Sequence, residues 1–210
     1  MGKLGFEILK AARPRQWLKN LAIFSTILFS GHLFEYTPIV QSLGAFFTFC
    51  FLASSNYIFN DILDVERDKK HPFKKFRPIA SGRLAIPYAW ISSLLFLILG
   101  LSISLTVGKT FFVMAALFSI LEYTYSLYFK HISVIDILMI TAAYFLRVYA
   151  GEAATGYHIS IWLALAVLSL ALFLAIGKRR SELTLIQSYS GIVPRDTRET
   201  LSNYSEKLLD

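Results

Sequence analysis

The chain has 210 residues, of which 55% are hydrophobic, 15% are aromatic and only 17% are charged. Soluble domains average about 45–50% apolar and about 25% charged residues, and here the apolar residues form long blocks. Blocks of about 18 or more apolar residues are long enough to cross roughly 30 Å of hydrocarbon. These properties exclude an ordinary soluble domain and indicate an all-α, polytopic membrane protein.

Cysteine, histidine and net charge narrow the function further. The single cysteine, Cys50, lies within an apolar block, which excludes a disulfide framework and a multi-cysteine metal site. The four histidines are far apart in the sequence, which argues against a transition-metal site. In a membrane protein, a formal net charge of +7 indicates orientation and contact with anionic lipid. We therefore expect the lipid bilayer as a partner and no nucleic acid.

Six apolar segments have the length of spanning helices. In chain order they cover residues 17–34, 39–59, 84–107, 111–129, 132–150 and 159–176. A charged loop, residues 61–83, separates the second segment from the third. Residues 177–210 form a polar tail that is too hydrophilic to span. We expect one transmembrane domain over residues 1–210, with about six helices and a cytoplasmic tail.

The basic residues gather on one predicted side of the membrane. With the N-terminus inside, all of the 21 Lys and Arg residues except Lys109 and Arg147 fall in cytoplasmic segments. An excess of Lys and Arg in cytoplasmic loops sets the orientation of a membrane protein. We therefore predict a multi-pass protein of the cell (inner) membrane whose N-terminus and charged loop are cytoplasmic.

A cluster of polar residues follows the second span and consists of Asn60, Asp61, Asp64 and Asp68. The three acids are spaced i, i+3 and i+7, so they share one face of a helix. Like charges so placed repel unless a cation lies between them. Hard oxygen ligands suit Mg²⁺, which prefers one or two carboxylates together with substrate phosphate oxygens. The spacing favours a magnesium and diphosphate site over the alternative, a solvated loop whose acids pair with nearby cations.

A basic segment, residues 69–83, comes directly after these acids and contains Lys74, Lys75 and Arg77. Arg binds phosphate in bidentate geometry and Lys binds it as a point charge. Taken alone, the segment could be an ordinary cytoplasmic loop. Next to the acids, it favours binding of a diphosphate.

The sequence Arg-Pro-Arg-Gln-Trp-Leu-Lys-Asn at 13–20 precedes the first span. Trp17 can lie in the interfacial belt and Lys19 can extend toward the headgroups, which would make the segment a membrane anchor. The pattern is more specific than an anchor requires. A functional role for Lys19 is therefore favoured.

Four ionisable residues lie at or within membrane depth, namely Glu122, Asp136, Arg147 and Glu152. Charges are costly there and are candidates for function. Asp136 and Arg147 are about three turns apart on the fifth span, so each needs a partner on another helix. A structural pair between helices and contact with a ligand are both open.

Together these motifs resemble a known family. Asn-Asp-x-x-Asp-x-x-x-Asp at 60–68, with Arg-Pro-Ile-Ala-Ser-Gly at 77–82, resembles the first aspartate-rich motif of the UbiA-type prenyltransferase superfamily. Residues 13–20, Tyr-Ser-Leu-Tyr-Phe-Lys at 125–130 and Gly-Lys-Arg-Arg-Ser-Glu at 177–182 are similar to one branch, the decaprenyl-phosphate phosphoribosyltransferases.

The resemblance implies an Mg²⁺-dependent membrane enzyme. Its reaction would transfer phosphoribose from 5-phosphoribosyl 1-diphosphate to a polyprenyl (decaprenyl) phosphate, in cell-wall arabinan precursor synthesis. Asn60, Asp61, Asp64 and Asp68 would hold the metal, and the three acids would be catalytic. The substrate-binding residues would be Lys19, Tyr57, Lys74, Lys75, Arg77, Tyr125, Lys130, Asp136, Arg147, Lys178, Arg179 and Glu182. Homo-oligomerisation is left open.

The superfamily generally has nine spanning helices, so the resemblance implies a chain that lacks the C-terminal helices. Glu182 is the nearest substitute for the second aspartate-rich motif. The alternatives are prenyl transfer to an aromatic acceptor, an inactive truncated relative, and a transporter. The heavily cationic face favours a sugar diphosphate over a prenyl diphosphate as donor. Charges at one face rather than at the midplane, without an inverted repeat, argue against a transporter.

Overall fold

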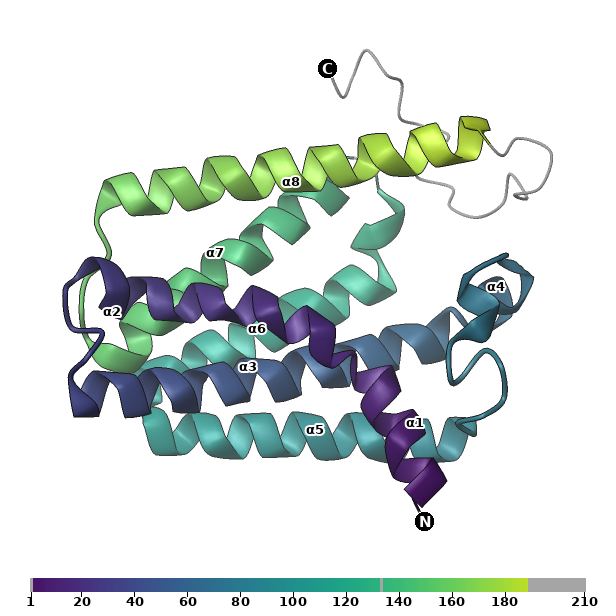
Figure 1. The fold of residues 1–210 in the computed structure, drawn as a ribbon, viewed down its shortest axis with the longest axis horizontal. Coiled ribbons are helices and arrows are strands. Elements are labelled where there is room, and N and C mark those ends of the chain that lie inside the picture. The colour runs from purple at the N-terminus through teal and green to yellow at the C-terminus, as the bar shows by residue number, and fades with distance from the viewer. Residues whose placement is uncertain (1, 133, 189–210) are drawn as a thin grey trace.

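The computed structural model describes residues 2–132 and 134–188, and all regular structure within these ranges is helical (Figure 1). Five of the described helices are long and apolar enough to cross a membrane. They are α3 (Tyr36–Leu63), α5 (Ile86–Val107), α6 (Lys109–Leu127), α7 (Ile135–Thr155) and α8 (Ile161–Ser188). This confirms the predicted class, an all-α polytopic membrane protein.

The first predicted span is built differently from the other five. After α1 (Gly2–Ala12), the chain continues into the 3₁₀ helix η1 (Pro14–Phe24) and then into the short helix α2 (Ser25–Phe29). A 3₁₀ helix rises about 2.0 Å per residue, against about 1.5 Å in an α-helix. The eleven residues of η1 and the five of α2 therefore extend about 30 Å, roughly the hydrocarbon thickness.

The acidic motif lies at a junction between two helices. Helix α3 ends at Leu63, and α4 (Val65–Lys70) begins after Asp64, whose φ and ψ are −93° and 8°. Backbone hydrogen bonds from Asp64 N to Asn60 O (3.0 Å) and from Asp68 N to Asp64 O (2.8 Å) carry the helical register across the junction. The predicted shared face is thus kept, but it is divided between two helices.

The last helix extends beyond its predicted end. Residues 177–210 were expected to form a polar tail, but α8 continues without a break through Gly177 to Ser188. Lys178 and Arg179 therefore project from a helix and have fixed directions. The rest of the predicted tail lies outside the described residues.

An apolar core joins α3, α6 and α7. Phe49 on α3 packs against Phe118 on α6, with ring centroids 4.6 Å apart. Gly151 on α7 permits a close approach of η1, because a Cβ there would lie 2.3 Å from the carbonyl oxygen of Ile23. Small residues bring helix backbones together in membranes in this way.

The charged segments meet at one end of the bundle. In Figure 1, α4 and the loop after it lie at the right, as do the C-terminal part of α8 and the connection between α6 and α7. Helix α2 and the turns joining α5 to α6 and α7 to α8 lie at the opposite end. The fold therefore brings the acidic motif, the basic loop, Lys130 and Lys178 to the same end.

Candidate functional site

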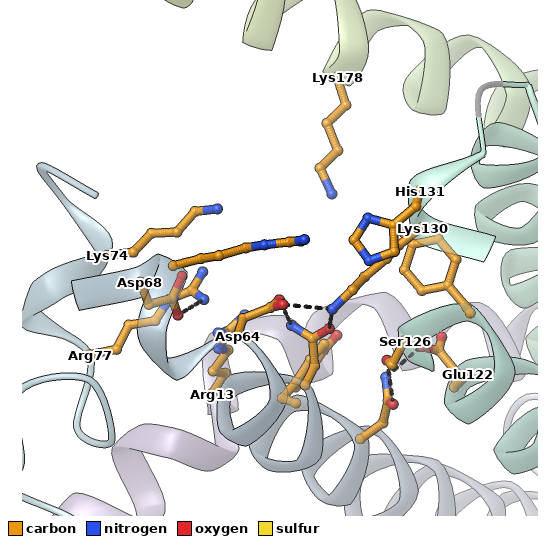
Figure 2. Close-up of a pocket in the computed structure, with 15 residues that line it drawn as sticks. Arg13, Asp64, Asp68, Lys74, Arg77, Glu122, Ser126, Lys130, His131 and Lys178 are labelled. Carbon is orange, nitrogen blue, oxygen red and sulfur yellow. Dashed lines mark hydrogen bonds and ion pairs between the residues drawn. The ribbon is translucent and has the colours of Figure 1, made fainter. Parts of the chain in front are cut away.

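A cavity of about 280 Å³ lies at the charged end of the bundle (Figure 2). It is lined by Arg13, Asn56, Tyr57, Asn60, Asp64, Arg67, Asp68, Lys74, Arg77, Glu122, Tyr125, Ser126, Lys130, His131 and Lys178. Six of these are Lys or Arg and three are Asp or Glu, so the lining has a formal positive surplus. Such a cavity suits a ligand that carries several negative charges. We call it the polar cavity.

Two arginines from distant segments contact two of the acids. The Nη1 of Arg77 donates to Asp61 Oδ1 at 3.0 Å and to Asp68 Oδ2 at 2.6 Å. The Nη2 of Arg13 donates to the same Asp61 oxygen at 2.5 Å. The second oxygen, Asp61 Oδ2, is buried and has no hydrogen-bond partner among the described residues. Asp61 is not among the residues that line the polar cavity, but it holds the two guanidinium groups that do.

The remaining acid of the motif, Asp64, contacts a different cation. The Nζ of Lys130 lies 2.7 Å from Asp64 Oδ1 and 3.1 Å from Asn60 Oδ1 (Figure 2). The amide of Asn60 in turn donates to Asp64 Oδ2 at 3.1 Å. Lys130 follows α6, so the motif is completed by a residue that is 66 positions away from Asp64. The structure thus brings two predicted motifs together.

The three acids therefore face cations rather than one another. Among the described residues, no three His, Cys, Asp or Glu side chains converge as a ready metal site. Burial raises the pKa of Asp68, despite the opposing effect of the Arg77 guanidinium. Burial makes the ionised form of a carboxyl group less favourable, and a further cation close to it would stabilise that ionised form. Whether the four motif residues hold a metal stays a prediction.

A second cavity, of about 120 Å³, adjoins the first and reaches further into the bundle. Its lining consists of Lys19, Tyr57, Leu121, Glu122, Tyr125, Met139, Ile140, Ala143, Tyr144, Arg147 and Lys178. Tyr57, Glu122, Tyr125 and Lys178 also line the polar cavity and form the boundary between the two. We call this second space the inner cavity.

Arg147 in the inner cavity has partners on other segments, as predicted. Its Nε donates to Asn20 Oδ1 on η1 at 2.9 Å, and its Nη2 lies 3.8 Å from Glu122 Oε1 on α6. The guanidinium carbon lies 4.7 Å from the centre of the Phe118 ring. The other oxygen of Glu122 accepts a hydrogen bond from the amide of Asn56 at 2.8 Å. This network connects η1, α3, α6 and α7.

Asp136 pairs with a residue that sequence spacing does not reveal. Its Oδ2 lies 2.5 Å from Arg179 Nη2 on α8, and the two side chains are 0% and 1% exposed. Neither residue lines the polar or the inner cavity. The pair fixes the rotation of α8, whose neighbouring Lys178 extends into the polar cavity (Figure 2).

The structure distributes the predicted substrate-binding residues unequally. Those that line the polar cavity are Tyr57, Lys74, Arg77, Tyr125, Lys130 and Lys178. Lys19 and Arg147 line the inner cavity, whereas Lys75 lies 5.2 Å from the Phe76 ring and lines neither. The side chain of Glu182 lies outside the described residues. A role in substrate binding for any of these residues stays a prediction.

Several lining residues were not among the predicted site residues. Asn56 lies one helical turn before Asn60, and Ser126 lies one turn before Lys130, where its hydroxyl donates to Asn56 Oδ1 at 3.0 Å. Helical spacing from the recognised motifs was a signal that could have identified both. Arg13 belongs to a recognised motif, but its contact with Asp61 has no sequence signal.

Comparison with known proteins places this arrangement in a family. The family model described as the UbiA prenyltransferase family matches residues 22–179. The chain is 35% identical to decaprenyl-phosphate phosphoribosyltransferase of Corynebacterium glutamicum, over 96% of this chain and 61% of that protein. It is 33% identical to the protein of the same name from Mycolicibacterium smegmatis, over 94% of this chain and 63% of that protein. The chain thus spans about three-fifths of the length of these relatives, and the predicted resemblance is confirmed.

A solved structure has the same fold. A UbiA homolog from Archaeoglobus fulgidus, bound to GPP and Mg²⁺, matches with a TM-score of 0.74 at 24% identity, over 89% of this chain and 66% of that chain. The fold, the acidic motif at the charged end and the match over residues 22–179 agree. The chain belongs to the UbiA prenyltransferase family.

Proposed function

We propose that the polar cavity binds 5-phosphoribosyl 1-diphosphate and that the protein transfers its phosphoribosyl group to a polyprenyl phosphate. The observation that carries this proposal is the cationic lining, which comes from several separate segments of the chain. A sugar with a diphosphate at one end and a phosphate at the other needs cations from more than one direction. Arg77 approaches the cavity from the basic loop, Lys130 from the segment that follows α6, and Lys178 from α8 (Figure 2). The names of the curated relatives support the same transferred group and the same acceptor.

We propose Mg²⁺ as the cofactor, held by oxygens of the acidic motif. Asn60, Asp64 and Asp68 line the polar cavity, and Asp61 Oδ2 is buried without a hydrogen-bond partner among the described residues. This set of hard oxygen donors fits Mg²⁺. The ion, when bound, neutralises charge on a diphosphate leaving group. The A. fulgidus structure with GPP and Mg²⁺ supports the proposal.

The proposed transfer exchanges one C–O bond for another. An oxygen of the acceptor phosphate bonds to C1 of the ribose, the bond between C1 and the diphosphate breaks, and diphosphate leaves with the electron pair. Arg77 and Lys130 line the cavity where this charge would develop, and charge stabilisation of this kind is often the largest catalytic contribution. The acceptor phosphate is already ionised near pH 7, so no general base is needed.

We infer that the charged end of the bundle faces the cytoplasm of a cell with this protein in its inner membrane. The basis is the concentration of Lys and Arg at that end. Cys50 is buried and is the single cysteine in the sequence, so an introduced cysteine can be labelled selectively. A membrane-impermeant maleimide should leave Ser81→Cys unlabelled in intact cells and label it after lysis. Labelling in intact cells would contradict the orientation.

Binding and transfer of the donor test the proposed function directly. Membranes that contain the chain should bind labelled 5-phosphoribosyl 1-diphosphate in Mg²⁺, lose it in EDTA, and pass the label to added decaprenyl phosphate. Binding should be measured separately from transfer. Binding of geranyl diphosphate without binding of the sugar diphosphate would contradict the proposal and favour prenyl transfer to an aromatic acceptor.

A further inference from the structure

We propose that the inner cavity is a separate binding site for the phosphate monoester of the lipid acceptor, and that Lys19 and Arg147 recognise it. This inference rests on the proposed function, because it assigns one of the two substrates to a second space. In this arrangement the donor occupies the polar cavity, and the acceptor head enters from the apolar side.

The charges that line the inner cavity indicate the charge of the ligand. Lys19, Arg147 and Lys178 are cationic, and Glu122 is the one carboxylate among the lining residues. The formal surplus is therefore two positive charges, at a depth where charge is costly. A phosphate monoester carries a charge of about −1.5 to −2 near pH 7. Such a group matches this surplus.

The remaining lining residues indicate an amphiphile. Leu121, Met139, Ile140 and Ala143 supply an apolar wall on α6 and α7, next to the cations. The volume of about 120 Å³ is less than half of the about 280 Å³ of the polar cavity, to which the donor is assigned. That space holds a phosphate group but not a phosphoribosyl diphosphate. A phosphate joined to a hydrocarbon chain fits a small, half-apolar cavity better than a free sugar phosphate does.

The boundary between the two cavities allows the substrates to meet. Tyr57, Glu122, Tyr125 and Lys178 line both spaces, so a group in the inner cavity lies next to a group in the polar cavity. Transfer requires the attacking oxygen to approach C1 to about 3–3.5 Å. Lys178 is placed to contact both ligands at this boundary.

The cation positions also separate Lys19 from the donor. Lys19 lines the inner cavity, and its Nζ lies 6.0 Å from the centre of the Tyr144 ring. Arg77 lines the polar cavity and does not line the inner one. Lys19 and Arg77 therefore line different cavities, and we assign Lys19 to the acceptor and Arg77 to the donor.

The test compares two ligands on the same variants of the full chain in detergent. Farnesyl phosphate represents the acceptor, and 5-phosphoribosyl 1-diphosphate with Mg²⁺ represents the donor. We expect Lys19→Ala to weaken farnesyl phosphate binding about ten- to a hundredfold and to leave donor binding unchanged. Lys109→Ala is the control, because Lys109 is the first residue of α6 and lines neither cavity. This variant should change neither affinity. Lys19→Arg should restore acceptor binding.

A second variant tests the charge argument with the opposite sign. Glu122→Gln keeps the shape of the side chain and removes the one carboxylate in the lining of the inner cavity. Farnesyl phosphate should therefore bind more tightly, and farnesol should not.

A loss of donor binding in Lys19→Ala without loss of acceptor binding would overturn the assignment and identify the sugar 5-phosphate as the ligand. Unchanged farnesyl phosphate binding in both variants would also overturn it. If the wild-type chain binds farnesyl phosphate but no donor, the proposed function fails, whereas the inner cavity is still a site for a lipid phosphate monoester.

Discussion

Two groups of paired charges in this protein use similar residues in different ways. In the polar cavity, Arg13 and Arg77 share Asp61, and their side chains are 28% and 26% exposed. Between α7 and α8, Asp136 and Arg179 form a pair that is almost completely buried and lines neither cavity. The first group can exchange its contacts for those of a ligand. The second group can only hold the helices together.

The comparison indicates that the degree of burial, more than the residue type, decides whether a group of paired charges can bind a ligand or only stabilise the helix packing. A buried ion pair contributes little net stability, but removing one partner leaves an uncompensated charge in the protein. A partly exposed cluster has access to water and to ligands, so losing one member costs less in folding. Four substitutions can test whether this division is correct.

The largest effect should follow from breaking the buried pair. Asp136→Asn leaves the Arg179 charge buried without its carboxylate, and the free energy of unfolding should fall by about 3–5 kcal/mol. Denaturant unfolding in detergent measures this change. The double variant Asp136→Leu with Arg179→Met removes both charges and should recover most of the loss. A decrease below about 1 kcal/mol for Asp136→Asn would mean that the pair is not structural.

The next largest effect should come from the first group, in which Arg13 and Arg77 share Asp61. Arg77→Ala removes hydrogen bonds to Asp61 and Asp68 and a cation from the cavity lining. Affinity for 5-phosphoribosyl 1-diphosphate should fall about ten- to a hundredfold, which corresponds to about 1.5–3 kcal/mol. Calorimetric titration measures it. Arg83→Ala is the matched control, because Arg83 lies in the same loop and pairs with Glu7 outside the cavity. If both variants bind the donor equally well, Arg77 does not bind the donor and has only a structural role.

A smaller effect should come from the acid that faces Lys130. Asp64→Asn keeps the shape of the side chain but removes one negative charge from the proposed metal ligands. The Mg²⁺ concentration that gives half-maximal donor binding should rise about tenfold, by analogy with the loss of a metal-supporting group, and the rate of transfer at the Mg²⁺ concentration that half-saturates the wild type should fall by a similar factor. Glu66→Gln is the control, since Glu66 is exposed and pairs with Lys69. Transfer at the wild-type rate in Asp64→Asn would contradict the metal assignment.

The smallest effect should be seen at the opposite end of the bundle. His32 Nδ1 lies 2.6 Å from Glu35 Oε1 in an exposed pair, and the His32 ring stacks on Tyr157 with centroids 4.0 Å apart. Exposed pairs contribute about 0–1 kcal/mol, so Glu35→Gln should lower the free energy of unfolding by less than about 1 kcal/mol. Donor binding should not change. A loss of donor affinity would show that this end is coupled to the polar cavity.

The membrane class and most of the helices follow from sequence alone for a simple reason. In hydrocarbon, backbone polar groups must be satisfied within the spanning segment, which leaves the α-helix as the structure for an apolar block of this length. The blocks at residues 39–59, 84–107, 111–129, 132–150 and 159–176 accordingly appear as α3, α5, α6, α7 and α8. The spacing of Asp61, Asp64 and Asp68 also survives, because the helical register continues across the α3–α4 junction.

The first span shows where local pattern is insufficient. Residues 17–34 contain an ordinary apolar block, but the chain enters it at Arg13, which has a left-handed backbone (φ 56°), and at Pro14. The resulting 3₁₀ helix packs against α7 at Gly151. Neither the helix type nor this contact can be deduced from hydropathy, because both depend on a neighbour more than a hundred residues away in the chain.

The tertiary structure alone decided which charges meet. Sequence spacing showed that Asp136 and Arg147 needed partners on other helices, but Arg179 and Asn20 were identified only by packing. The neighbours Lys74 and Lys75 are equivalent by composition, yet only Lys74 lines the polar cavity. Side-chain direction depends on how each helix is rotated against the others, and the segments that set this rotation are far apart in the sequence. Composition and periodicity therefore determined what kind of protein this is, and helix packing decided which residues form its site.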